Sequence, residues 1–281
     1  MVCTLEDLLM SIFVFGSNEN GRHSGGSSQK ARESYGAVDG QVYGRQGNAF
    51  GIPTRDKRAA SLGVSKILPS VRGFLEYAKN NPTETFEVTN IGCGQAKYPM
   101  DFMAPLFVGY TPNVHFIDQE FQSLIPNTVA RTRLMVVSSK EFEDHEKLWA
   151  ITEKFTHLYD LKDFELIPAM EGLGARLISG WAKKKNIPIH TFKPQWTRID
   201  SPTASKKISN GNEINAAAIF DKNAWSLAYA TDLLVLDNYA SKEIKGLMTT
   251  ASQSFMNSIL YIGSSEQTQQ PSRNPNQNTS Y

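Results

Sequence analysis

The sequence predicts an α/β protein made of two alternating α/β domains, and three observations support this prediction. The chain has 281 residues, whereas one ordinary domain needs roughly 100–200. Short runs of β-branched and aromatic residues alternate with segments whose apolar residues recur at helical spacing. Glycine-rich turns follow two of these runs, at Ser17–Ser28 and at Gly92–Gly94. This alternation is typical of a parallel sheet with crossover helices.

The first half of the chain is expected to form one α/β domain over residues 1–118. Its predicted strands are Ser11–Gly16, Ala49–Thr54, Phe86–Ile91 and Val114–Asp118. A helix is expected to begin in the first glycine-rich turn and to end near Tyr35-Gly36, because glycine commonly follows the end of a helix. Apolar residues at helical spacing predict a second helix over Leu68–Asn80, with Pro69 in its first turn. Met100–Val108 is predicted to be a short helix.

A linker is expected over Gln119–Thr132, followed by a second α/β domain over residues 133–262. Its predicted strands are Arg133–Ser138, Glu165–Pro168, Ile189–Phe192, Leu233–Leu236 and Ile259–Ile262. Its predicted helices are Phe142–Leu158, Gly174–Lys185, Ile214–Tyr229 and Lys242–Ser252. The polar segment Thr197–Glu213 is expected to be a long loop, of the kind that often serves as a lid or binding segment. Gly263–Tyr281 contains no Ala, Val, Leu, Ile, Met or Phe and is expected to be a disordered tail.

Composition excludes several classes of protein. The net charge is +1, from 29 basic and 28 acidic residues, so nucleic-acid binding is disfavoured, because neutralising many phosphates needs a basic surplus. No apolar run reaches about 18 residues, and Met1–Met10 lacks the basic start of a signal peptide. Cys3 and Cys93 are too few for a disulfide framework, and no Cys/His spacing suggests a metal site. We therefore expect a cytoplasmic protein with no membrane span and no metal, whose homo-oligomeric state stays open.

The strongest chemical signal is the glycine-rich segment Phe15–Ser28. Glycine lets the backbone approach a ligand closely, and the start of the following helix offers free N–H groups to a phosphate. The alternative is a tight turn with a helix cap, since the segment matches neither a Walker loop nor a strict GxGxxG pattern. His23 within it could act as an acid, a base or a phosphate donor, or could be an ordinary loop histidine.

The second signal is the turn that follows the third predicted strand, Thr89–Pro99. Tyr98 follows its Gly92-Cys93-Gly94 turn and could stack on a base or cover a ribose; the alternative is a β-turn with a core tyrosine. Cys93 is a candidate nucleophile, but no base is specified nearby. A small buried thiol is therefore the favoured interpretation of Cys93.

The first half, over Ile12–Asp118, resembles the macro-domain-like proteins, which are α/β folds that bind ADP-ribose. The shared motifs are Phe15-Gly16-Ser17-Asn18, Gly21-Arg22-His23 with Gly25, Ile52-Pro53-Thr54, and Gly92-Cys93-Gly94 with Tyr98. The resemblance implies that Gly25-Gly26 and Gly92–Gly94 flank a diphosphate and that Asn18 contacts the distal ribose. The ligand-binding set expected here is Gly16, Ser17, Asn18, Gly25, Gly26, Gly92, Cys93, Gly94 and Tyr98.

The second half, over Arg133–Ile262, resembles the SLOG superfamily, whose members are Rossmann-like nucleotide-ligand sensors and processing enzymes. The similar segments are Ser138–Phe142, Glu171–Arg176 and Lys222-Asn223. The resemblance implies a phosphate pocket in which Gly174 offers a backbone N–H and Lys140 and Lys222 offer positive charge. The ligand-binding set expected here is Ser138, Lys140, Gly172, Gly174, Arg176, Lys222 and Asn223. Arg176 replaces an acidic residue of the family, which argues against hydrolase chemistry in this half.

Together the two resemblances imply a small nucleotide ligand derived from NAD, such as ADP-ribose or a cyclic ADP-ribose-like molecule, and no further cofactor. One function left open is binding and sequestration, which in a phage would blunt a host signal, as in counter-defence. The other is a hydrolase of ADP-ribosyl or nucleoside-phosphate bonds, in which Asn18 and His23 would orient water. The lack of a convincing catalytic pair favours binding.

Overall fold

The computed structural model describes residues 11–128, 130–139, 142, 144–169, 173–237 and 242–262. The predicted α/β class is confirmed, because two mostly parallel sheets of five and four strands alternate with helices. The chain divides into two compact units. The first unit runs to Asn127 and also includes Pro194–Ala224, and the second holds Thr128–Lys193 and the residues from Trp225 onward. The expected tail beyond residue 262 lies outside the described residues.

This division differs from the uninterrupted second domain expected from the sequence. Pro194–Ala224 joins the first unit because its side chains contact the loop and helix that follow the third parallel strand. Arg198 Nη1 lies 2.6 Å from Asp101 Oδ2, and the Arg198 guanidinium lies over the Phe102 ring, 4.8 Å from its centroid. The Tyr98 hydroxyl lies 3.0 Å from Thr203 Oγ1. These long-range contacts cannot be read from local sequence.

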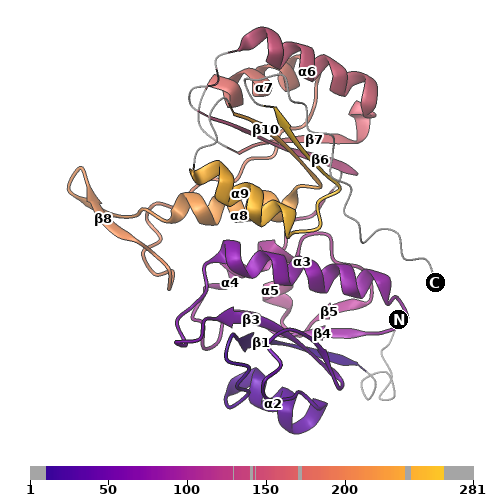
Figure 1. Ribbon diagram of the computed structural model, residues 1–281, viewed down its shortest axis with the longest axis vertical. Coiled ribbons are helices and arrows are strands. Elements are labelled where there is room, and N and C mark those ends of the chain that lie inside the picture. Colours follow the sequence, from indigo (N-terminus) through magenta and orange to yellow (C-terminus); the bar gives the residue numbers. More distant parts are fainter. Residues whose placement is uncertain are drawn as a thin grey trace. The chain divides into compact units, whose positions relative to one another are not determined.

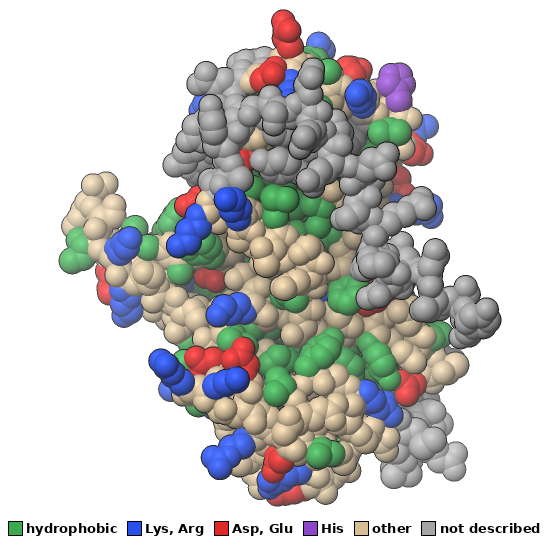
Figure 2. Space-filling view, viewed as in Figure 1, with side chains coloured by type: hydrophobic (Ala, Val, Ile, Leu, Met, Phe, Trp, Pro, Cys, Tyr) green, Lys and Arg blue, Asp and Glu red, His purple; other side chains and the backbone are tan. Residues whose placement is uncertain are grey.

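The described part of the chain has no helix long and apolar enough to cross a membrane. Nor does that part contain a cluster of three or more His, Cys, Asp or Glu side chains able to hold a metal ion. Acidic and basic side chains are interspersed on the face shown in Figure 2, which agrees with the nearly balanced charge of the sequence.

A five-stranded sheet forms the centre of the first unit (Figure 1). Its strands, in spatial order, are β2 (Gly44–Gln46), β3 (Ala49–Arg55), β1 (Ile12–Asn18), β4 (Phe86–Val88) and β5 (Val114–Phe116). β2 is antiparallel to β3, and every other pair is parallel. β1 is buried along almost its whole length, as expected of a central strand covered on both faces.

Helices cover both faces of this sheet, with α3 on one face and α2 on the other (Figure 1). The helices of the first unit are α2 (Gly26–Tyr35), α3 (Val64–Asn80), α4 (Met100–Met103), η1 (Ala104–Phe107) and α5 (Gln119–Ser123). The predicted end of α2 is confirmed, since Gly36 follows it with φ +74 and its N–H donates to Ala31 O. The first five residues of the predicted linker, Gln119–Ser123, thus form helix α5.

Helix α3 begins four residues before its predicted start. The prediction placed Pro69 in the first turn, and this was wrong, because Pro69 lies inside the helix. Val64 and Ile67 extend the apolar stripe in the N-terminal direction, and both are fully buried. Burying these two side chains outweighs the one backbone hydrogen bond that proline cannot donate.

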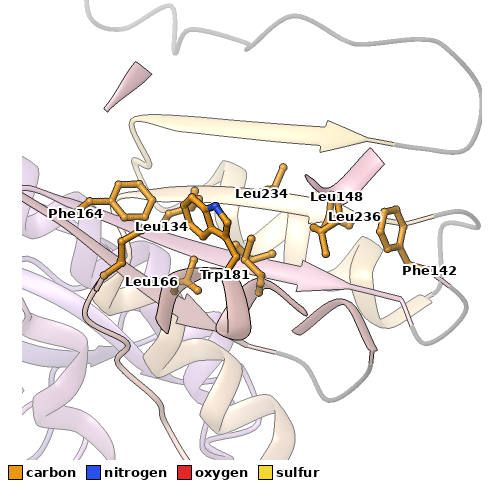
Figure 3. Packing of buried hydrophobic residues seen from close by; sticks show 12 residues of the cluster. Leu134, Phe142, Leu148, Phe164, Leu166, Trp181, Leu234 and Leu236 are labelled. Atoms are coloured by element: carbon orange, nitrogen blue, oxygen red, sulfur yellow. The ribbon is translucent and has the colours of Figure 1, made fainter. Parts of the chain in front are cut away.

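A four-stranded parallel sheet forms the centre of the second unit. Its strands, in spatial order, are β11 (Ser258–Ile262), β10 (Asp232–Leu236), β6 (Thr132–Ser138) and β7 (Phe164–Pro168). The helices around it are α6 (His145–Leu158), η2 (Leu161–Asp163), α7 (Leu173–Lys184), α9 (Lys242–Ser252) and the end of α8 (Ala218–Tyr229). Figure 3 shows leucines from β6, β7 and β10 packed against Trp181 of α7 and against Phe142 and Phe164.

Three predictions for the region after α7 were wrong, and one of them is the start of a helix: the helix expected from Ile214 begins at Ala218, because Ile214 belongs to a strand. Ile189–Phe192 is not a strand, because it makes only a single bridge, between Leu166 and Ile189. The chain leaves the sheet there, and the His190 ring stacks on Tyr229 with centroids 4.2 Å apart. The polar loop Thr197–Glu213 contains β8 (Lys206–Ser209), which pairs with β9 (Asn212–Asn215) in an antiparallel hairpin.

Both sheets have the same parallel strand order. The order is β3-β1-β4-β5 in the first unit and β7-β6-β10-β11 in the second. In each, the first strand of the unit lies between the second and the third parallel strands. The strand order therefore reverses beside the first strand: the second strand lies on one side of it and the third strand on the other. Ligands of open α/β sheets bind at the carboxyl ends of the strands at such a switch point.

One buried acid lies in the first turn of α8. Asp221 is 5% exposed, and its buried Oδ2 has no hydrogen-bond partner among the described residues. Burial raises the pKa of Asp221 from 3.8 to about 6, because an ionised carboxylate loses its hydration in this position.

We expect Asp221→Asn to change how stability depends on pH. Between pH 3.8 and about 6 the native Asp221 keeps a proton that the unfolded chain releases. The contribution of Asp221 to stability is therefore lost as pH rises through this window, by at most about 1.4 kcal/mol per pH unit. Urea unfolding at several pH values should show that Asp221→Asn gains stability relative to the wild type as pH rises from about 4 to 6, whereas the control Glu19→Gln, whose side chain is exposed, should follow the wild type. Equal slopes in both variants would contradict the assignment.

Candidate functional site

A cavity of about 360 Å³ lies at the carboxyl ends of the strands in the first unit. Its lining comes from the end of β1, the end of β3, the loop after β4 and the start of α2. The lining residues are Gly16, Gly25, Gly26, Ser27, Thr54, Arg55, Asn90, Gly92, Gly94, Gln95 and Ala96. The cavity thus lies at the switch point that the strand order defines, between β1 and β4.

Glycines make the wall of this cavity largely from backbone. A Cβ added to Gly16 would lie 3.5 Å from Thr54 Oγ1 and 3.9 Å from the Gly92 amide nitrogen, so the segments that line the cavity approach one another closely. A Cβ added to Gly25 would collide with the side-chain amide of Gln95. A ligand in the cavity therefore meets N–H and C=O groups at short range.

The start of α2 supplies positive potential to the cavity. The residue before the helix is Gly25, so no side chain caps the free N–H groups of the first turn, and this turn contains no acidic residue. Gly26 has φ +58, a conformation that favours glycine. The uncapped amides and the helix dipole together favour an anionic group such as phosphate.

Arg55 is the basic side chain that lines the cavity. It is the last residue of β3 and is half-buried, and no acidic group within the described residues pairs with it. A guanidinium in this position can donate two hydrogen bonds to a phosphate. Sequence reasoning missed Arg55, although it directly follows the Ile52-Pro53-Thr54 motif and ends a strand beside the switch point.

A second cavity, of about 490 Å³, adjoins the first and shares Ser27, Asn90 and Gly94 with it. Its other lining residues are Thr89, Cys93, Met100, Ile117 and Asp118. Ile117 is 55% exposed, which is unusual for isoleucine. The second cavity therefore combines an apolar wall with a carboxylate.

Asp118 is held in its ionised form. Its Oδ2 accepts a hydrogen bond of 2.6 Å from Asn90 Nδ2, and its Oδ1 accepts from the N–H groups of Glu120 and Phe121 at the start of α5. The bond from Asn90 is the main reason that the pKa of Asp118 lies below its ordinary value. The carboxylate can accept a hydrogen bond from a ligand and repels a phosphate.

Cys93 lines the second cavity as a protonated thiol. Burial is the main factor that raises the pKa of Cys93 from 9.0 to about 12, and the charges of Asp118 and Asp101 add to it. A thiol with such a pKa is a poor nucleophile at neutral pH. The position suits a small half-buried side chain.

Asn18 and His23 build the glycine-rich loop, and neither lines either cavity. The Asn18 side chain is 5% exposed; its Oδ1 accepts from Asn20 and Arg22 N–H groups, and its Nδ2 donates to Arg22 O. His23 is fully buried, with Nε2 3.2 Å from Gln41 O and its ring edge-on to Phe15. Both side chains therefore fix the loop conformation.

Ser17 and Tyr98 also contribute to loop structure. Ser17 is buried, and its hydroxyl donates to Val42 O. Tyr98 is 2% exposed, and its hydroxyl donates a hydrogen bond of 2.6 Å to Leu62 O. Neither residue lines the cavities.

The structure thus separates the expected residues of the first unit into two groups. Those brought together at the cavities are Gly16, Gly25, Gly26, Gly92, Cys93 and Gly94. Those that hydrogen-bond within or between the loops and do not line the cavities are Ser17, Asn18, His23 and Tyr98. The lining residues that sequence reasoning did not assign to the site are Ser27, Thr54, Arg55, Thr89, Asn90, Gln95, Ala96, Met100, Ile117 and Asp118. The order of the strands in the sheet brings these residues together, and no local sequence motif reveals that order.

The residues expected to form a site in the second half are less completely described. Lys140 and Gly172 lie outside the described residues. Ser138 is buried at the end of β6, and a Cβ added to Gly174 would lie 2.5 Å from its Oγ, so Ser138 packs against the first turn of α7. Arg176 is exposed on α7. Lys222 and Asn223 belong to the first unit. Whether these residues bind a ligand stays a prediction.

Comparisons with known proteins give no family for the chain. No protein-family model matches it, and neither the curated proteins nor the solved structures contain a significant match. The fold and the site define the chain at the level of class: an α/β protein with two mostly parallel sheets and a glycine-lined cavity at the switch point of the first.

We expect Cys93 to react slowly with alkylating reagents at neutral pH. With a pKa of about 12 in place of 9.0, its thiolate fraction is about 10³-fold lower than that of an ordinary cysteine. The measurement is the rate of iodoacetamide labelling in a Cys3→Ser background, followed by mass spectrometry. Urea-unfolded protein is the control and should react at the ordinary rate. A native rate equal to the unfolded rate would contradict this expectation.

Proposed function

We propose that the first unit binds an NAD-derived nucleotide of the ADP-ribose type and holds it intact. The observation that carries the proposal is the glycine-lined cavity at the switch point, where the uncapped start of α2 and the Arg55 side chain both favour an anion. A diphosphate placed there would receive backbone N–H groups and one guanidinium. The resemblance of the glycine-rich motifs to macro-domain-like proteins supports the same ligand class.

Charge orients the ligand between the two cavities. The phosphates belong in the first cavity, because the ionised Asp118 would repel them from the second. The second cavity suits a nucleobase, which can pack on the apolar Ile117 and Met100 and donate an exocyclic N–H to Asp118. A ligand with a diphosphate and a base fits both, whereas free phosphate fills only the first.

Binding is favoured over hydrolysis by the state of the side chains around the cavities. Asp118 already accepts three hydrogen bonds, and the Cys93 thiol is protonated at neutral pH. Asn18 and His23, which a hydrolase would use to orient water, are engaged elsewhere: Asn18 Nδ2 donates to Arg22 O, and His23 Nε2 lies 3.2 Å from Gln41 O. Neither side chain lines either cavity. In a phage, capture of such a nucleotide would lower the free concentration of a host signal.

We expect isothermal titration calorimetry to detect binding of ADP-ribose and to show weaker binding of AMP and of adenosine. Gly94→Leu should reduce affinity at least tenfold without lowering the melting temperature. Gly94 faces open space and lacks a positive φ, so leucine would fill the cavities without straining the backbone. Gly94→Ala, with a smaller side chain, should show a partial loss.

We expect Arg55→Gln to weaken binding of ADP-ribose by about 10- to 100-fold, because a charge-assisted hydrogen bond contributes about 1.5–3 kcal/mol. Adenosine, which carries no phosphate, should bind both proteins equally. The matched control is Arg58→Gln, whose exposed side chain does not line the cavities and whose loss should leave affinity unchanged.

Chromatography of the recovered ligand separates the two functions. ADP-ribose returned intact after long incubation supports binding, and its conversion would establish hydrolysis instead. Absence of binding across ADP-ribose, cyclic ADP-ribose and NAD would overturn the proposal.

A further inference from the structure

The β8–β9 hairpin in the first unit is an exposed two-stranded sheet. Its turn, Asn210-Gly211, has φ +50 and +79, which is the type I′ geometry that favours a regular hairpin. Lys206 pairs with Glu213 across the strands at 3.7 Å. Within the described residues no third strand joins this sheet. A hairpin of two strands alone is only marginally stable in water.

An apolar side chain in this hairpin is unusually exposed. All residues of β8 are exposed, and Ile208 is 81% exposed, the largest fraction among the large hydrophobic side chains of the described chain. Figure 1 shows the hairpin projecting from the chain that precedes α8, and Figure 2 shows hydrophobic and charged side chains along this projection. Covering Ile208 would remove apolar surface from water.

Within the described residues, the two edges of the hairpin differ in whether another part of the chain contacts them. Ala216 N–H donates to Ser205 O within the hairpin, whereas Asn215 N–H points outward and donates to Trp196 O, each at 2.7 Å. The β9 edge is therefore already occupied at its base. By the alternation of an antiparallel ladder, Lys206 and Ile208 direct their N–H and C=O groups away from β9. Those groups have no backbone partner among the described residues.

The β8 edge is complementary to itself in one register. Two antiparallel β8 strands can hydrogen-bond only if residues whose backbone groups point outward, Lys206 and Ile208, lie opposite each other or opposite their own copies. In a symmetric pair, this condition places the twofold axis at a residue and not between two residues. An axis at Lys207 would place two lysines directly opposite each other, which is unfavourable. An axis at Ile208 instead pairs Ile208 with Ile208 of the second copy and Lys207 with Ser209. This register covers the exposed isoleucine and opposes no like charges.

We propose that β8 is a self-association edge, through which two copies of the chain form a continuous four-stranded antiparallel sheet about an axis at Ile208. The interface is closed, since the same edge is used on both copies. It is also small, so the dimer is in concentration-dependent equilibrium with the monomer. This inference is independent of the proposed nucleotide binding.

Sedimentation velocity of the full chain over a range of concentrations tests the proposal. We expect the mass to rise from one chain toward two as concentration increases. Ile208→Lys should keep the chain monomeric over the same range, with an unchanged melting temperature because the side chain is exposed. The matched control is Leu158→Lys, since Leu158 is 73% exposed in the second unit; it should dimerise like the wild type. A monomer at every concentration, or a dimer that persists in Ile208→Lys, would overturn the proposal.

Cysteine cross-linking tests the register. In a chain whose two native cysteines are replaced by serine, Ile208→Cys should form a covalent dimer under oxidised glutathione, because the two thiols face each other across the axis. Ser209→Cys should not, because it faces Lys207. Equal cross-linking of both variants would contradict the register, and capture of a different protein's strand in place of a second copy would contradict self-association.

Discussion

The position of β1 between β3 and β4 is the constraint on which the first unit depends. β1 pairs in parallel with both neighbours. The chain that follows β1 therefore turns toward one face of the sheet, and the chain that follows β4 turns toward the other face. This separation opens the space that the cavity occupies. The lining segments are the ends of β1 and β3, the loop after β4 and the start of the helix that follows β1. The second unit repeats the same strand order.

The side chains around the cavity divide their work in a consistent way. Backbone groups and Arg55 face the space, while buried polar side chains hold the loops that present the backbone. Asn18 lies where the register between β1 and β3 shifts, and its amide then organises the turn that follows. Glycine residues have no side chains that could hold a loop in one conformation. The fixed conformation of these loops therefore depends on the buried polar side chains that contact them on the side away from the cavity.

The sequence predicted the α/β class, most strands and the glycine turns, because these depend on local periodicity and turn chemistry. It did not predict Arg55 or Asp118 as lining residues, because their meeting depends on strand order. The β8–β9 hairpin was missed although Asn210-Gly211 is a strong turn signal, since the flanking residues are mostly polar. The contact between Arg198 and Asp101 joins residues almost a hundred positions apart, and no local pattern reveals it.

The return of Pro194–Ala224 to the first unit has a consequence for how the protein is made. The first unit consists of two stretches of chain. They are separated by Thr128–Lys193 of the second unit, which contains β6, α6, β7 and α7. During synthesis its sheet can form early, but Arg198 and Thr203 reach their contacts only after much of the second unit has left the ribosome. The two units therefore complete their synthesis in alternation, and cleavage of one peptide bond cannot divide the chain into two complete units.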